Sequence, residues 1–184
     1  MTDRSIYQTK LGATFDQLPA ILQNFHSLDG PKHWRGKASI SGGQGIIARS
    51  VRWLFGFPAP TDEVQVDVKI VNGAKSGVSF ERWQRVFGNK SFHSVLSHEK
   101  NDGFIERFGI LGFEIGLDVH DQGIIMPVIG WKIGPIPLPL CLAPKSETLE
   151  FQDNQGRFRF DVKVSLPIIG LLMHYQGWLE PEAE

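Results

Sequence analysis

The sequence predicts a mainly β fold: a meandering antiparallel sheet of nine or ten strands, curled into a barrel or half-barrel, with two helices near the N-terminus. Three observations support this prediction. From residue 63 onward, apolar side chains recur at every second position, which is the period of a half-buried strand. Short polar turns separate these runs, and short turns join antiparallel strands, whereas parallel strands need long crossovers. Several of the 20 glycines fall inside the runs, where they allow the bends of a curling sheet.

The two helices are expected before the main series of strands. Four apolar side chains recur at helical spacing within residues 14–28, and a turn at residues 29–31 ends that segment. Pro19 fits a helix only in its first turn, so a start near Leu18 is the alternative. A second helix, short and amphipathic, is expected within residues 43–57.

The strands are expected in segments that alternate or are rich in β-branched and aromatic residues. These segments are 33–41, 64–71, 78–87, 91–98, 104–109, 113–120, 124–134, 147–151, 157–166 and 171–179. The glycines inside them are Gly36, Gly116, Gly130 and Gly177. A twisted open sheet of this size tends to curl or split, so a barrel or deep half-barrel covered by the helices is expected, and a two-sheet sandwich is the alternative.

Composition limits the class of protein. The 184 residues are expected to form a single domain, residues 1–184, with its core at about residues 7–179. The net charge of −1, from 19 basic and 20 acidic side chains, argues against a general nucleic-acid binder. Cys141 is the only cysteine, which suits a reducing compartment. Without a signal pattern or a long apolar span, the expected location is the cytoplasm, with the inner-membrane surface as a peripheral site.

Several patterns resemble catalytic or cofactor motifs but lack their context. Residues 43–48 fit G-x-G-x-x-A, yet the preceding strand carries charges and no further strand–helix unit follows. Asp118 and His120 share a strand face that most simply points to water, and Cys141 has no charged neighbour to activate it. No catalytic residue, metal or cofactor is therefore predicted.

A ligand cavity is predicted from strands whose two faces are both mixed. Residues 80–87 place charged beside aromatic side chains on each face, and residues 105–108 repeat this mixture. Such strands are typical of a cavity wall that is mostly apolar with a few polar anchors, and a guanidinium there would hold a carboxylate or phosphate. The alternative is a solvent-facing sheet on which arginine stems cover aromatic rings. The predicted ligand-binding residues are Trp83, Arg85, Arg107, His174 and Tyr175.

An apolar rim is predicted from two further segments. Residues 131–145 hold four prolines among apolar residues, which predicts a stiff, extended strap because proline removes backbone donors. The strap can cover the core, bind a partner protein or contact a membrane interface, and the helix within residues 43–57 offers a matching apolar set with arginines for anionic lipid. The predicted rim or membrane contacts are Ile46, Ile47, Arg49, Trp53, Phe55, Phe57, Trp131, Ile136, Leu138 and Leu140.

Six motifs, in order, cover the chain from about Tyr7 to Leu179: YQTKLGATFDQLP, RGKAS, ERWQRVFG, ERFGILGFEIGL, IPLPLCLAP and RFRFDVKVSLPIIGLLMHYQGWL. Together they resemble a family of bacterial domains of unknown function. Members of that family occur alone or after a saccharopine-dehydrogenase-like NAD-binding domain. The resemblance implies a bacterial source and an NAD-dependent partner protein, and it assigns no catalytic residue.

Three functions fit these patterns. The favoured one is non-enzymatic binding of an apolar or amphipathic, lipid-like small molecule at the cytoplasmic membrane surface. The second is an interaction or accessory domain for an oxidoreductase. The third is an enzyme whose acid–base pair comes from distant strands, for example His174 with Glu81 or Glu106. The ligand, the oligomeric state and the closure of the sheet stay open.

Overall fold

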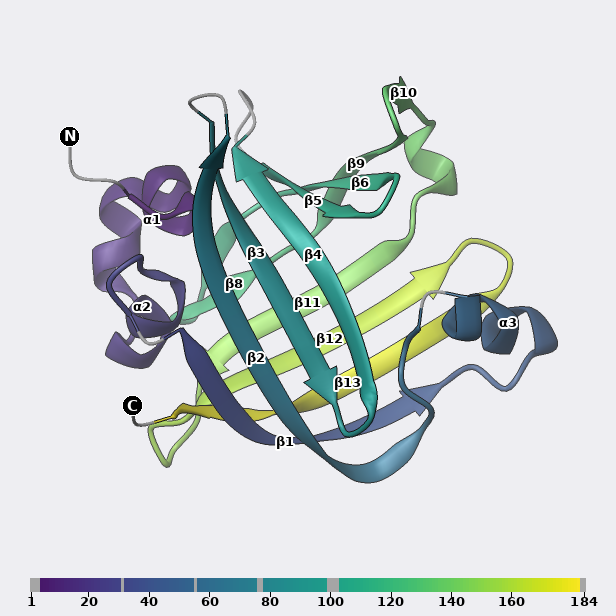
Figure 1. Cartoon of the computed structure of the whole chain (residues 1–184), viewed down its shortest axis with the longest axis horizontal. Helices are drawn as coiled ribbons and strands as arrows, with labels where there is room; N and C mark the ends of the chain where they lie inside the picture. Colours follow the sequence, from purple (N-terminus) through teal and green to yellow (C-terminus); the bar gives the residue numbers. More distant parts are fainter. Residues whose placement is uncertain (1–3, 31, 55, 76–77, 99–102, 183–184) are drawn as a thin grey trace.

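The computed structural model describes residues 4–30, 32–54, 56–75, 78–98 and 103–182 (Figure 1). The helices are α1 (Ile6–Leu11), α2 (Ala20–His26) and α3 (Ile46–Leu54), with 3-10 segments η1 (Gly12–Gln17) and η2 (Leu140–Leu142). The strands are β1 (His33–Gly42), β2 (Thr61–Lys75), β3 (Val78–Phe87), β4 (Lys90–His98), β5 (Phe104–Phe108), β6 (Leu111–Ile115), β7 (Asp118–His120), β8 (Gly123–Ile125), β9 (Val128–Ile133), β10 (Ile136–Pro137), β11 (Lys145–Gln152), β12 (Phe158–Leu166) and β13 (Gly170–Pro181).

All strands in the described residues belong to one antiparallel sheet of 13 strands, in the order β10-β9-β6-β5-β4-β3-β2-β1-β13-β12-β11-β8-β7. The mainly β class is therefore confirmed, and of the two predicted forms, a barrel or a half-barrel, the closed barrel is wrong. Among the described residues, the two end strands, β10 and β7, pair with one neighbour each and not with one another.

The sheet has more strands than predicted because two long predicted strands are divided and the proline-rich segment contributes the short strand β10. Residues 113–120 contain most of β6 and all of β7, and residues 124–134 contain most of β8 and all of β9. Gly116 and Pro127 mark the breaks: the Gly116 N–H donates to the Pro127 carbonyl over 2.9 Å, where the two connections lie side by side. Strand β6 pairs with β9 near one end of the sheet, while β8 pairs with β11 near the other end. The chain therefore passes from one end of the sheet to the other at these connections, but the end strands themselves do not pair.

The first predicted helix is interrupted near its middle. Leu18, the residue before Pro19, is extended, as residues before proline usually are, and α2 begins directly after the proline. This confirms the later of the two predicted starts. The helix α1, which the sequence analysis did not predict, has a capping box: Ser5 Oγ accepts from the Gln8 N–H over 3.0 Å, and Gln8 Oε1 accepts from the Ser5 N–H over 2.9 Å.

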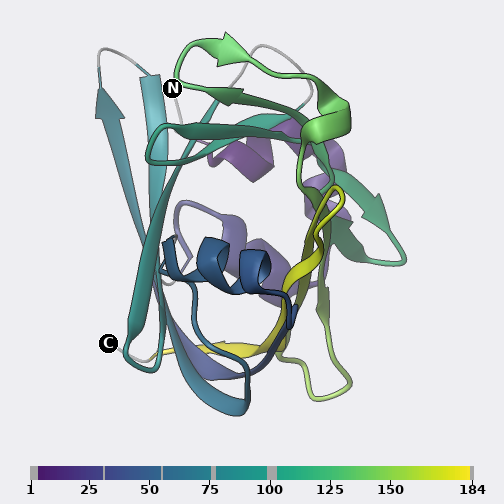
Figure 2. The same cartoon turned by 90° about the vertical axis from the view of Figure 1, so that its right-hand side faces the viewer.

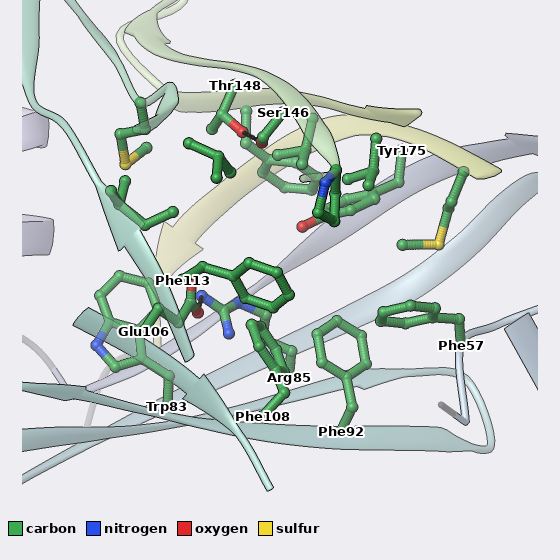
Figure 3. Close-up of a pocket in the computed structure, with 18 of the residues that line it drawn as sticks. Phe57, Trp83, Arg85, Phe92, Glu106, Phe108, Phe113, Ser146, Thr148 and Tyr175 are labelled. Atoms are coloured by element: carbon green, nitrogen blue, oxygen red, sulfur yellow. Dashed lines mark hydrogen bonds and ion pairs between the residues drawn. The ribbon is translucent and has the colours of Figure 1, made fainter. Parts of the chain in front are cut away.

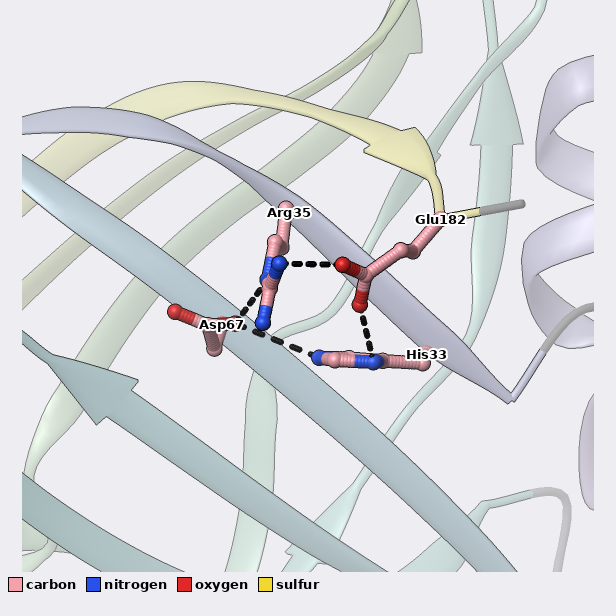
Figure 4. A network of polar contacts seen from close by, with 4 residues as sticks. All are labelled: His33, Arg35, Asp67 and Glu182. Atoms are coloured by element: carbon pink, nitrogen blue, oxygen red, sulfur yellow. Dashed lines mark hydrogen bonds and ion pairs between the residues drawn. The ribbon is translucent and has the colours of Figure 1, made fainter. Parts of the chain in front are cut away.

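Strand β1 shows the alternation on which its prediction depended. Trp34, Ala38 and Ile40 are buried on the inner face. On the outer face, Arg35 Nε donates to Asp67 Oδ1 of β2 over 2.6 Å, and His33 and Arg35 both contact the Glu182 carboxylate near the C-terminus (Figure 4). This partly exposed ion-pair network joins β1, β2 and Glu182, and such surface pairs contribute little stability singly.

The sheet bends round on itself, so β3 and β4 lie across the interior from β11 and β12 (Figures 1 and 2). Helices α1 and α2 cover one end of the curved sheet, and α3 lies at the opposite end. This arrangement encloses the space in which the candidate site lies.

Candidate functional site

The curved sheet encloses a cavity of about 410 Å³, lined by strands from both sides of the interior and by side chains of all three α-helices. Most of its wall is apolar, and the aromatic side chains dominate. The phenylalanines that line it are Phe25, Phe57, Phe87, Phe92, Phe104, Phe108, Phe113, Phe158 and Phe160. Such a volume and lining are typical of small-molecule sites, which enclose about 300–1,000 Å³.

One charged pair lies in the wall of this cavity. Arg85, in β3, donates from Nη1 to Ser94 Oγ over 2.8 Å and from Nη2 to Glu106 Oε1 over 3.2 Å. Its guanidinium carbon lies 4.8 Å from the centre of the Trp83 ring and 5.8 Å from that of Phe92 (Figure 3). Burial acts to lower the pKa of Arg85, but the Glu106 carboxylate, together with Tyr175, Tyr7 and Glu150, more than offsets it and the pKa is raised. The arginine is thus a fixed charge that already has a counter-ion.

A second polar group ties the helices to the sheet. His26 Nε2 lies 2.6 Å from Glu150 Oε2 of β11, and the His26 ring stacks on Tyr7 with centroids 3.7 Å apart. The Glu81 carboxylate accepts from the backbone N–H of Ile6 over 3.1 Å and from Trp83 Nε1 over 3.0 Å. Buried carboxylates are stable only when their oxygens are paired in this way. Glu150 also lines the cavity, so its carboxylate both pairs with His26 and borders the cavity.

Hydroxyl groups lie across the cavity from Arg85. Ser146 Oγ and Thr148 Oγ1 of β11 are 2.8 Å apart, and Tyr175 of β13 lies on the same side (Figure 3). Burial raises the pKa of Tyr175 to about 12, with Arg85 acting in the opposite direction. The polar contacts available to a bound molecule are therefore one compensated ion pair, one further carboxylate and a few hydroxyls.

Both tyrosines of the chain are expected to ionise at a higher pH than tyrosines exposed to water. Burial also raises the pKa of Tyr7 well above its usual value of 10.0. An unfolded chain ionises its tyrosines near pH 10, so it loses protons first and the free energy of unfolding falls from about pH 10 to about pH 12. The Tyr175 shift corresponds to a loss of roughly 3 kcal/mol over that range. Phenolate absorbance during an alkaline titration should rise only together with the loss of far-ultraviolet circular dichroism. A phenolate signal below pH 10.5 in folded protein would contradict this prediction.

The structure places three of the five predicted ligand-binding residues in the cavity wall: Trp83, Arg85 and Tyr175. Arg107 and His174 are not in the lining. Arg107 Nη1 donates to Ser97 Oγ over 2.6 Å, and His174 Nε2 lies 2.7 Å from Asp161 Oδ1. Each is the strand neighbour of a lining residue and therefore points to the other face of the sheet.

The acid–base pairs suggested for an enzyme do not form. His174 pairs with Asp161, Glu81 is bonded by Ile6 and Trp83, and Glu106 pairs with Arg85. Sequence reasoning also missed the pairing of His26 with Glu150, since those residues lie 124 positions apart. Within the described ranges, no group of three potential ligands is placed to hold a metal ion.

The predicted rim residues divide into two sets. Phe57 and Trp131 line the cavity, while Ile46, Ile47, Arg49, Trp53, Ile136 and Leu140 are exposed and Leu138 is half-buried. Phe55 lies outside the described residues. The strap is not the extended segment predicted, because it turns back through β10 and η2, and Trp131 Nε1 donates to the Pro139 carbonyl over 2.9 Å. In the part of the chain that is described, no helix is long and apolar enough to cross a bilayer.

Fold and site together define a class of protein: a single curved antiparallel sheet that encloses an apolar cavity. Comparison with known families identifies the family within this class. Residues 18–179 match the family described as Domain of unknown function (DUF4166), and the chain belongs to that family. No curated protein matches the chain. The NAD-dependent partner implied by the resemblance stays a prediction.

Proposed function

We propose that this protein binds one apolar or amphipathic small molecule inside its curved sheet, as a binding protein and not an enzyme. The observation that carries the proposal is the cavity of about 410 Å³, whose wall is apolar apart from a few polar side chains. Empty apolar cavities forfeit packing contacts at their walls, so an apolar occupant stabilises the fold.

The charges in the wall favour an occupant with an uncharged polar end. The Arg85 guanidinium is already neutralised by Glu106, and the Glu150 carboxylate borders the same space. An anionic head group would have to compete with Glu106 and would lie near two carboxylates in a medium of low dielectric constant. A hydroxyl or carbonyl group instead needs only hydrogen bonds, which the Tyr175, Ser146 and Thr148 hydroxyls and the arginine supply.

Displacement of a dye would test this function in solution. The uncharged probe N-phenylnaphthylamine should bind with increased fluorescence, and dodecanol should displace it. Dodecanoate, which has the same chain length, should displace it at least about tenfold less well, because its charge must be neutralised or left near the carboxylates. No probe binding, or no displacement by either compound, would contradict the proposal.

A matched pair of variants shows whether the probe occupies the cavity. Thr148→Trp places an indole in the cavity and should abolish probe binding. Glu147→Trp adds the same ring one position earlier, where the side chain is 69% exposed and only a surface ion pair with Lys163 is lost. That variant should bind the probe as the wild type does, whereas equal loss in both would place the probe elsewhere.

A further inference from the structure

One end of the molecule carries a concentration of exposed apolar side chains. We call this end the rim and define it as α3, the β5–β6 turn, the segment from β9 to η2 and the β12–β13 turn, which lie together on the side facing the viewer in Figure 2. Exposed apolar residues occur in every part of it, including Ile110 at 73%, Ile136 at 61% and Leu140 at 56%. Monomeric proteins rarely leave so large an apolar patch in water, so the rim points to an interaction surface.

Helix α3 is apolar on the face that points away from the protein. Its inner face holds Ala48 and Arg52, and Arg52 is buried because its Nη1 donates to the Gly43 and Leu172 carbonyls over 2.9 Å each. Of the two arginines in this helix that were expected from the sequence to reach anionic lipid, Arg49 and Arg52, Arg52 is therefore not available. The outer face holds Ile46 and Trp53, each 81% exposed. This reverses the usual arrangement of a surface helix, in which the apolar side faces the core.

The β12–β13 turn is also built from residues that a turn in water disfavours. Ile168 is fully exposed with φ +68°, a left-handed conformation that strains β-branched residues. The Ile169 N–H donates to the Pro167 carbonyl over 2.7 Å, so Ile168 is the centre of a γ-turn of the rare, strained kind. Asparagine or glycine would suit this conformation better, so folding alone does not explain an isoleucine.

The charge of the rim has one sign. Residues 41–61, 107–113, 128–146 and 164–173, which contain its four parts, include no aspartate or glutamate, although the chain has 20. The basic residues there include Arg49 and Lys145, which are exposed, and Lys132, which is half-exposed. Apolar side chains mixed with cations and free of acids complement an anionic lipid surface.

We propose that the rim docks on an anionic lipid bilayer. Ile46, Trp53 and Ile168 enter the interface, and Arg49 and Lys145 lie at the level of the lipid phosphates. Val51 of α3 and Leu142 of η2 line the cavity, and Leu142 is also 54% exposed, so the rim borders the cavity directly. Docking therefore brings the wall of the cavity against lipid, which under the proposed function is the source or destination of the bound molecule.

Flotation with vesicles would test the docking. The full chain should bind vesicles of phosphatidylcholine with about a third phosphatidylglycerol at least about tenfold more strongly than phosphatidylcholine alone, and high salt should reduce that difference. The double variant Trp53→Ser/Ile168→Asn should bind the mixed vesicles about tenfold less or weaker still. Because asparagine relieves the strained turn, Ile168→Asn alone should keep or raise the unfolding temperature while weakening vesicle binding.

Two controls accompany the flotation experiment. Val71→Ser/Val78→Ser removes two apolar side chains, 60% and 52% exposed, from the other end of the sheet and should leave vesicle binding unchanged. The rim variant should still bind N-phenylnaphthylamine in solution, so a failure of docking is separate from a failure of the cavity function. Equal flotation of the wild type and the rim variant would overturn the proposal. A wild-type dimer that is lost in the rim variant but kept in Val71→Ser/Val78→Ser would also overturn it, because the rim would then be a self-association surface.

Discussion

Replacing Glu106 by leucine should lower the free energy of unfolding by about 2 to 4 kcal/mol. The substitution leaves the Arg85 guanidinium, whose side chain is 15% exposed, in an apolar wall without its counter-ion. Arginine cannot relieve this by losing its proton, because its pKa lies far above the physiological range. The remaining contacts, to Ser94 Oγ and the Trp83 ring, do not neutralise the charge. Urea denaturation followed by tryptophan fluorescence would measure the loss.

The double variant Arg85→Met/Glu106→Leu should recover most of this stability, since replacing both members of a buried pair by apolar side chains is often neutral. Glu147→Leu is the matched control: it removes the glutamate of an exposed pair with Lys163 and should cost less than about 1 kcal/mol. If Glu106→Leu lowers the free energy of unfolding no more than Glu147→Leu does, the Arg85–Glu106 pair contributes no more than an exposed ion pair. The cavity wall would then not disfavour a charged ligand, which would contradict the proposed uncharged polar end.

The part of the site that the sequence predicts is the part set by local periodicity. Trp83 and Arg85 are two positions apart on β3 and therefore share a face, which turned out to be the cavity face. The same rule explains the failures. Arg107 and His174 were predicted to line the cavity, but the lining residues are their strand neighbours Glu106 and Tyr175. Those strands carry polar residues on both faces, so the pattern does not show which face points inward.

Contacts between distant segments could not be predicted in this way. The pairing of His26 with Glu150 and that of Glu81 with the start of α1 depend on how the helices cover the curved sheet. The same holds for the ends of the sheet. Residues 113–120 look like one strand, but the path of β6 and β7 to opposite ends depends on their partners, β9 and β8. Long-range pairing of this kind leaves no local signal in a single sequence.

The curvature that creates the cavity is expected to depend on Gly36 and Gly177, at the centre of the sheet. These residues lie in β1 and β13, the neighbouring strands between β2 and β12. A Cβ atom at Gly36 would lie 1.8 Å from the Trp178 carbonyl oxygen, and one at Gly177 would lie 2.2 Å from that of Lys37. Backbone atoms cannot move aside as a flexible side chain can, so the two strands would have to separate. Gly36→Ala and Gly177→Ala should each cost about 3 kcal/mol or more, measured by urea denaturation.

Gly112→Ala provides the comparison that ties this cost to backbone contact. Gly112 also lies in a strand, β6, but its added Cβ would approach side chains and no backbone: Lys132 at 3.2 Å, which can shift, and Ile105 at 3.7 Å, an ordinary contact. Its cost should be under about 1 kcal/mol. If Gly36→Ala is as mild as Gly112→Ala, the central strands can separate at little expense, and the bend is imposed by the connections near Gly116 and Pro127 instead. If Gly36→Ala lowers the free energy of unfolding by about 3 kcal/mol or more, the close contact of β1 and β13 sets the bend of the sheet. These two strands then fix the separation of the cavity walls before any ligand enters.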